Sequence, residues 1–218
     1  MRLGFFCSFG APFSMAYQPK DAFYHKAKRE GYRSRAAYKL LEINRRFRLL
    51  RAGDRVVDLG AAPGGWLQVA SQLVGPKGKV VGVDVQAIEP LGTQNIHLLR
   101  ADIASEETLT KIRELLGSLA DCVISDLSPH LSGIHDADIN RSAELVRKAL
   151  QVACAVLRPG GHFVIKAFVG EEIGGLSKEI GRQFNSLDRT RPEATRKGSS
   201  EIYFVAKGFK SSVVSSPG

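Results

Sequence analysis

The stretch RVVDLGAAPGGW (residues 55–66) decides the fold class. A short β-branched strand runs directly into a Gly-rich turn and then into a helical pattern. In an open α/β sheet, such a turn lets the backbone approach a ligand at the carboxyl ends of the strands. The turn lacks GxGxxG spacing, and Pro63 has no N–H for a pyrophosphate. The stretch therefore disfavours a dinucleotide and favours a ligand without phosphate.

The same alternation of strands and helices continues along the chain. Continuous apolar strands separated by helices are typical of a parallel sheet covered on both faces. No helix separates the last two strands, so we expect them to pair antiparallel. The sequence predicts an α/β, Rossmann-like fold with strands at 55–59, 79–85, 96–102, 121–127, 162–168, near 187–191 and 201–209, and helices at 66–74, 106–117, 138–157 and 172–184.

Length predicts one domain. The chain has 218 residues and a mass of 23.7 kDa, within the range of a single α/β unit. We assign residues 17–210 to this domain, with a basic helical segment at 17–51. Residues 1–16 are expected to be a disordered or mis-annotated extension, with the true start at Met1 or Met15. Residues 211–218 read as a disordered tail.

Composition excludes several classes of protein. Hydrophobic residues make up 44% and charged residues 24%, as in ordinary globular chains. No apolar run reaches the roughly 18–20 residues of a membrane-spanning helix. Three separated cysteines exclude a disulfide framework. The five histidines show no ligand spacing, so no metal site is expected.

Positive charge is concentrated near the N-terminus. The net charge is +9, and residues 17–51 hold eleven Lys or Arg against three Asp or Glu, a net charge of +8. Such a segment fits a polyanion, RNA or DNA ahead of a membrane surface. Residues 33–50 predict a helix with Ser34 as its N-cap, an apolar stripe on one side, and Arg35, Lys39 and Arg46 together on another.

Acidic residues end three predicted strands at one edge of the sheet. Asp84 follows the Gly-rich turn at the distance of an acid that binds ribose hydroxyls. Asp102 is placed to contact an adenine amino group, and Asp126 ends the fourth strand. The candidate cofactor-binding residues are Gly60, Pro63, Gly64, Gly65, Trp66, Asp84, Asp102 and Asp126.

The segments DLGAAPGGW, SDLSP and VIKAF resemble the RrmJ/FtsJ family of ribose 2′-O-methyltransferases, over about Tyr32 to Lys210. The resemblance implies S-adenosyl-L-methionine as cofactor. It also implies a catalytic tetrad of Lys39, Asp126, Lys166 and Glu201.

Lys166 is the member of this tetrad least compatible with a purely structural role. It interrupts the apolar strand HFVIKAF, where an unpaired ammonium would be costly. A ribose hydroxyl is a poor nucleophile and gains from a partner that accepts its proton or stabilises an alkoxide. The sequence leaves open whether Lys166 acts as a neutral base or as an orienting cation.

The expected substrate is RNA. The candidate RNA-binding residues are Arg33, Arg35, Arg45, Arg196 and Lys197. We expect a minority of the aromatic rings in the basic segment to stack on bases, among Tyr17, Phe23, Tyr24, Tyr32 and Tyr38. The resemblance implies a uridine of 23S ribosomal RNA in the large ribosomal subunit, methylated by a cytoplasmic monomer. Alternative methyl acceptors are a tRNA anticodon loop, mitochondrial ribosomal RNA and an acceptor other than a ribose. Alternative functions are those of an NAD-dependent dehydrogenase and of a non-catalytic RNA-binding assembly factor.

Overall fold

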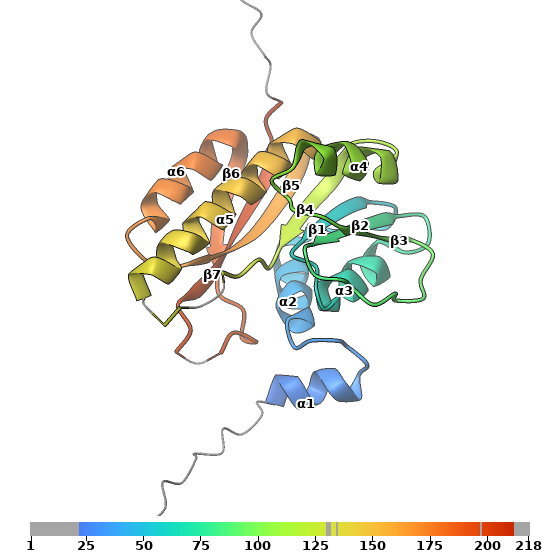
Figure 1. The fold of residues 1–218 in the computed structure, drawn as a ribbon, viewed down its shortest axis with the longest axis horizontal. Helices are drawn as coiled ribbons and strands as arrows, with labels where there is room; N and C mark the ends of the chain where they lie inside the picture. The colour runs from blue at the N-terminus through green and yellow to red at the C-terminus, as the bar shows by residue number, and fades with distance from the viewer. Residues whose placement is uncertain (1–21, 130–131, 134, 197, 212–218) are drawn as a thin grey trace, which may run out of the picture.

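A computed structural model describes residues 22–129, 132–133, 135–196 and 198–211. Within them, a central sheet has helices on both faces (Figure 1). The helices are α1 (Ala22–Arg29), α2 (Ala37–Phe47), α3 (Gly65–Val74), α4 (Glu106–Leu116), α5 (His135–Val156) and α6 (Ile173–Gln183). The strands are β1 (Arg55–Leu59), β2 (Lys79–Asp84), β3 (Ile96–Arg100), β4 (Ala120–Ser125), β5 (Leu157–Phe168), β6 (Phe184–Thr190) and β7 (Glu201–Phe209).

The sheet confirms the predicted fold class. Its seven strands follow the order β3-β2-β1-β4-β5-β7-β6. The strands β1 to β5 pair in parallel, and β7 pairs antiparallel with both β5 and β6. The chain winds outward in both directions from β1 and β4, so the carboxyl ends of these strands form the crevice where such folds bind ligands.

Two apolar layers cover the sheet. On one face α4, α5 and α6 bury side chains such as Ile112, Val146 and Ile180. On the other face α2 and α3 bury Leu40 and Leu67. The strands β1, β2 and β4, which are rich in Val and Ile, are buried on both faces, as expected for parallel strands between helices.

The helix predicted over residues 33–50 is shorter than expected. α2 begins after Ala36, without a side-chain cap, so the expectation that Ser34 caps it was wrong. The Ser34 side chain instead packs against Gly65. The helix ends at Phe47, because Arg48 adopts the left-handed conformation, with a φ of 53°. The Asn44 side chain then accepts hydrogen bonds from the backbone of Leu49 and Leu50. Tertiary contacts and a local cap therefore override the apolar periodicity.

α1 lies below the body of the molecule and follows directly into the turn before α2 (Figure 1). It buries only Ala27, in a small cluster with Tyr38 and Ala194. The expectations for residues 1–16 and for the tail beyond residue 211 lie outside the described residues. No helix in the described part of the chain is long and apolar enough to cross a bilayer.

We predict that Leu40→Ala lowers the free energy of unfolding by about 2–5 kcal/mol, because it leaves a cavity where α2 meets the sheet. Leu40 is fully buried. Urea denaturation measures the effect. The control Leu119→Ala removes a side chain that is 43% exposed and is expected to cost less than about 1 kcal/mol. Equal losses for the two variants would contradict this packing.

Candidate active site

The four residues of the predicted tetrad come together on one face of the sheet at the carboxyl edge. Lys166 on β5 pairs in register with Tyr203 on β7. Asp126 lies just beyond the end of β4. Lys39 lies on α2, which packs on the same face of the sheet as Tyr203. Because side chains alternate along a strand, Glu201 is on the same face as Tyr203.

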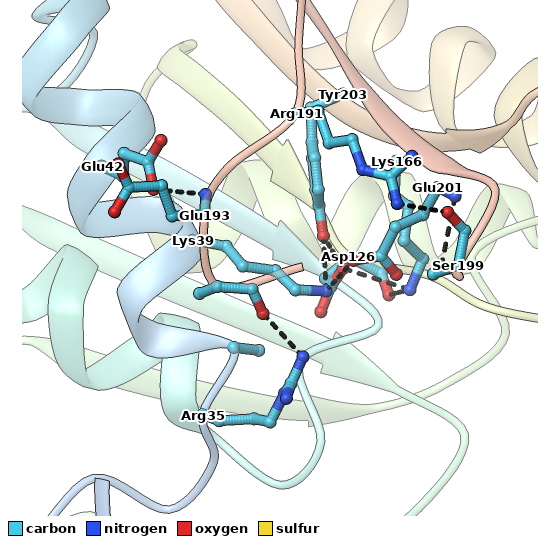
Figure 2. A network of polar contacts seen from close by, with 12 residues as sticks. Arg35, Lys39, Glu42, Asp126, Lys166, Arg191, Glu193, Ser199, Glu201 and Tyr203 are labelled. Atoms are coloured by element: carbon cyan, nitrogen blue, oxygen red, sulfur yellow. Dashed lines mark hydrogen bonds and ion pairs between the residues drawn. The ribbon is translucent and has the colours of Figure 1, made fainter. Parts of the chain in front are cut away.

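These residues form a continuous polar chain, which we call the catalytic cluster: Glu201, Lys39, Tyr203, Asp126 and Lys166 (Figure 2). Lys39 Nζ lies 2.6 Å from Glu201 Oε1 and 3.1 Å from Tyr203 Oη. Tyr203 Oη donates to Asp126 Oδ1 at 2.6 Å. Lys166 Nζ lies 3.1 Å from the same Oδ1 atom and donates to the Asp126 backbone oxygen at 2.7 Å.

Burial makes these pairings necessary. Lys39 is 6% exposed and Lys166 is 7% exposed, and an ammonium removed from water is stable only with close acceptors. Each lysine has one carboxylate partner. Tyr203 connects the two ion pairs, and burial, followed by Asp126, raises the pKa of its hydroxyl well above 10. Tyr203 therefore stays a hydrogen-bond donor.

The segment that precedes β7 holds Glu201 in place. Arg191 donates to the Ser199 backbone oxygen at 2.6 Å, and the Ser199 hydroxyl accepts from the backbone of Glu201 at 3.2 Å. The backbone of Glu193 donates to Glu42 on α2 at 2.8 Å. These contacts tie the helix that carries Lys39 to the segment that carries Glu201 (Figure 2).

A pocket of about 280 Å³ lies where β1, β2 and β4 end, and the residues that directly follow Asp126, Leu127 to Pro129, form part of its lining. Gly60, Asp84 and Asp102 line it. Gly60 has a φ of 77°, and a Cβ there would lie 2.5 Å from Leu127 Cδ2. The turn therefore requires glycine, and the fold brings its backbone to the pocket wall.

The two acids at the pocket are held by backbone groups. Asp84 Oδ2 accepts from Ala62 at 2.9 Å, and its Oδ1 accepts from Gln86 at 2.8 Å. Asp102 Oδ1 accepts from Ala104 at 2.9 Å. Each carboxylate oxygen has a second lone pair, so fixed acceptors for hydroxyl or amino groups remain.

The rest of the Gly-rich turn packs against the chain before α2. A Cβ on Gly65 would lie 2.2 Å from Ser34 Oγ. The Arg33 guanidinium donates to the backbone oxygen of Pro63, and Gly64 lies against the same side chain. Trp66, predicted at the cofactor, is 3% exposed and donates to the Ala36 backbone oxygen. Its indole therefore joins α3 to α2 and does not line the pocket.

The predicted RNA-binding residues divide into two groups. Arg33 also donates to the backbone oxygens of Glu89 and Pro90, and Arg35 donates to that of Ala194 at 2.6 Å. These two guanidinium groups therefore support the protein itself. Arg45 and Arg196 are exposed. Lys197 lies outside the described residues.

Sequence reasoning missed Tyr203 and Asp58. Tyr203 was detectable as the residue two positions after Glu201 in a strand, on the same face. Asp58 lies in the apolar strand β1, and the argument applied to Lys166 applies to it as well. It is fully buried, and neither carboxylate oxygen has a hydrogen-bond partner among the described residues. Burial, then the charges of Asp126 and Asp84, raise the pKa of its carboxyl group well above 3.8.

The described residues contain no group of three His, Cys, Asp or Glu side chains that could hold a metal ion. A larger hollow, of about 690 Å³, lies at the amino ends of β2 and β3. Lys77, Asn95 and His97 line it, and it includes no member of the catalytic cluster. Volume alone therefore does not mark the candidate site.

Comparison with known proteins identifies matching sequences. The FtsJ-like methyltransferase family matches residues 32–209. A protein of Methanothrix thermoacetophila named ribosomal RNA large subunit methyltransferase E is 52% identical over 93% of this chain and 78% of its own length. Proteins with the same name from Methanothermobacter thermautotrophicus and Archaeoglobus fulgidus are 47% and 49% identical, over 89% and 88% of this chain and 92% and 97% of their own lengths.

Solved structures share the fold. A crystal structure assigned to a ribosomal RNA methyltransferase of Plasmodium falciparum aligns with a TM-score of 0.74 at 27% identity, over 82% of this chain and 98% of the other. A second, from Clostridium thermocellum, aligns with a TM-score of 0.52 at 18% identity, over 79% and 97%. The second likeness concerns the fold alone.

We predict that Asp58→Asn gains stability relative to the unsubstituted protein as the pH rises. Between 3.8 and its raised folded pKa, Asp58 keeps its proton when folded and loses it when unfolded, so rising pH favours unfolding. Asparagine has no carboxyl proton to lose, so this pH-dependent destabilisation is absent from the variant. The unfolding free energy of Asp58→Asn minus that of the unsubstituted protein should therefore rise by about 1.4 kcal/mol per pH unit in that window.

Urea denaturation at pH 5, 6 and 7 in the absence of cofactor measures this shift. Asp188→Asn, at an exposed position in β6, controls for the loss of a surface carboxylate. A difference between Asp58→Asn and the unsubstituted protein that does not change with pH would contradict the buried, protonated state.

Proposed function

Because this chain belongs to the FtsJ-like methyltransferase family, we propose that it methylates a ribose 2′-hydroxyl in RNA of the large ribosomal subunit. The names of the relatives support ribosomal RNA as the substrate class. The observation that carries the proposal is Lys166, a buried lysine held by Asp126 at the sheet edge, where the three residues that follow Asp126 line the pocket together with Gly60 of the Gly-rich turn. We take uridine as the acceptor nucleoside on the family resemblance.

The geometry of Lys166 suits a reacting hydroxyl. Its nitrogen has two acceptors, both on Asp126, so one tetrahedral position is left for the substrate. That position holds an N–H in the ammonium form and a lone pair in the amine form. It either stabilises the developing alkoxide or accepts the proton of the hydroxyl.

The other members of the cluster orient this nitrogen. Tyr203 donates to Asp126 and so directs the carboxylate toward Lys166. Lys39 donates a hydrogen bond to the Tyr203 hydroxyl and forms an ion pair with Glu201. Its positive charge in a site of low dielectric constant also favours a developing negative oxygen.

The pocket residues fit S-adenosyl-L-methionine, the methyl donor of this family. When bound, this cofactor supplies an electrophilic methyl group on a sulfonium. Asp84 is the acceptor for ribose hydroxyls and Asp102 the acceptor for an adenine amino group, while Gly60 allows close approach of the backbone. Holding the acceptor hydroxyl in line with the methyl group supplies much of the rate in such a displacement.

The two cysteines in the described part of the chain disfavour methylation of a base carbon by a thiol nucleophile. Cys122 is fully buried and Cys154 is partly buried, and burial raises the pKa of both thiols. Reactive cysteines need the opposite, a lowered pKa and access to substrate. A hydroxyl acceptor fits the lysine-centred cluster better.

We further propose that the enzyme acts as a cytoplasmic monomer. All five members of the catalytic cluster come from one chain, so no second copy is needed to complete it. Residues 17–210 form the proposed methyltransferase domain.

The position of the transferred methyl group tests this function. Large ribosomal subunits that lack the modification and, in a parallel reaction, total tRNA are incubated with the protein and methyl-labelled cofactor, and the RNA is hydrolysed in alkali. We expect the label in alkali-resistant dinucleotides, because a 2′-O-methyl group blocks cleavage at the adjacent phosphate. Label in mononucleotides would indicate base methylation, and label in tRNA alone would assign a different substrate; either result overturns the proposal.

We predict that Lys166→Ala lowers turnover by at least about 10²- to 10⁴-fold, the usual contribution of a proton-transfer group. Lys166→Met should behave alike, because it keeps the aliphatic stem but not the nitrogen. Cofactor affinity, measured by calorimetry, should stay within about threefold. Lys111→Ala, which removes an exposed lysine on α4, is the control. Wild-type turnover in either Lys166 variant would contradict the assigned role.

A further inference from the structure

Asp58 is a buried acid that the catalytic cluster does not use. It lies in β1, it is fully buried, and neither of its carboxylate oxygens has a hydrogen-bond partner among the described residues. Most buried polar groups in folded proteins have a partner, and an ionised carboxylate without one is costly to bury. An apolar side chain would fill this position in the strand without that cost. The packing of β1 therefore does not explain why an acid is present.

The strand register places Asp58 between two other acids. β1 lies between β2 and β4 in the sheet (Figure 1). Asp58 is in register with Gly82 on β2 and with Ile124 on β4. Asp84 and Asp126 follow these two positions by two residues, so they project from the same face as Asp58, because side chains alternate along a strand. Three acids from three adjacent strands therefore gather on one face of the sheet.

The surroundings of Asp58 keep its proton in place. Burial raises the pKa of its carboxyl group well above 3.8, and the charges of Asp126 and Asp84 raise it further. Helix α3, which covers this face, has no charged residue. The remaining titratable groups of the face are paired with other groups of the protein. They are Lys39 on α2, Lys166 on β5, Glu201 and Tyr203 on β7, and Arg33 and Arg35 before α2.

The methyl donor of this family carries a positive charge to the same edge of the sheet. Asp84 lines the pocket, as does Gly60, which follows Asp58 by two residues, and the residues directly after Asp126 form part of the same lining. Lys166, the proposed partner of the methyl acceptor, is held by Asp126. A nearby cation favours the ionised form of a carboxyl group, and the effect is strongest where water is excluded. A sulfonium bound at this edge therefore opposes the factors that keep Asp58 protonated.

We propose that Asp58 is the counter-charge of the cofactor, which loses its proton to solvent when the sulfonium cation binds and regains a proton after methyl transfer. The inference rests on the proposed function for the place of the reacting methyl group. In that reaction an O–C bond forms and a C–S bond breaks, its electron pair stays on sulfur, and the hydroxyl proton is released. The sulfonium becomes a neutral thioether while Asp58 becomes a neutral acid. The net charge buried at this edge is thus the same before and after the reaction.

The proposal makes cofactor affinity depend on pH and product affinity independent of it. When binding releases one proton, affinity rises with pH by up to about tenfold per unit. The rise lies between the pKa of Asp58 in the complex and its raised pKa in the free protein. The demethylated product, S-adenosylhomocysteine, keeps the amino and carboxyl groups of the cofactor but lacks the sulfonium charge. Asp58 therefore keeps its proton when this product binds.

Titration calorimetry of the unsubstituted protein tests the inference. S-adenosyl-L-methionine and S-adenosylhomocysteine are each titrated between pH 5 and pH 8, in two buffers with different ionisation enthalpies, so that the difference in heat counts the protons released. The amino and carboxyl groups of the ligands contribute alike to both series. We expect the cofactor to release more protons than the product, with a difference that approaches one proton per site at the pH of steepest affinity change.

Asp58→Asn assigns the proton to this residue, with Asp188→Asn, at an exposed position in β6, as the matched control. Asparagine has nearly the shape of a protonated aspartate but cannot ionise. We expect the variant to abolish the difference in proton release between the two ligands. At pH 8 its affinity for the cofactor should fall about tenfold, the equivalent of one pKa unit, with product affinity within about twofold of the unsubstituted protein. Asp188→Asn should behave like the unsubstituted protein.

The outcomes separate this inference from the proposed function. Equal proton release for cofactor and product in the unsubstituted protein would overturn the role of Asp58 and leave ribose methylation intact. A difference in release that persists in Asp58→Asn would assign the proton to another group and also overturn it. Absence of labelled ribose in treated ribosomal subunits, with the proton release present, would overturn the proposed function and not the charge coupling.

Discussion

The pairing of two nearly buried lysines with two carboxylates is the constraint on which the site depends. Lys39 and Lys166 are each less than one-tenth exposed, and neither is stable there without an acidic partner. Asp126, just beyond β4, and Glu201, at the start of β7, provide those partners, and Tyr203 connects them. The cluster therefore exists only when α2, β4, β5 and β7 are all in place.

The Gly-rich turn connects the helix that carries Lys39 to the pocket at the ends of β1, β2 and β4. Gly60 admits the backbone to the pocket wall, and Gly65 admits Ser34 from the chain before α2. Trp66 completes the contact by donating to Ala36 at the start of α2. The helix that carries Lys39 is thus docked on the turn whose Gly60 lines the pocket, and the position of one depends on the other.

Some basic residues of this protein bind oxygen atoms of the protein itself, and others remain exposed; the net charge counts both kinds alike. Arg33, Arg35 and Arg46 bind backbone or side-chain oxygens of the protein. Arg45, Lys28 and Arg196 remain exposed. The +8 segment is therefore partly an internal scaffold that holds α1 and α2 against the body. The smaller exposed set is what remains for an RNA backbone.

The sequence by itself determined the alternation of strands and helices and the ligand edge of the sheet. These follow from local patterns: apolar runs and a Gly-rich turn after a strand. The four tetrad residues were predicted from the family resemblance, and the structure brings their side chains together. Only the tertiary structure decided where α2 begins and ends, that Trp66 serves packing, that Tyr203 joins two ion pairs, and which arginines are engaged. Those features depend on which side chains meet across the fold, and residues as far apart as Lys39 and Tyr203 leave no periodic signal of their meeting.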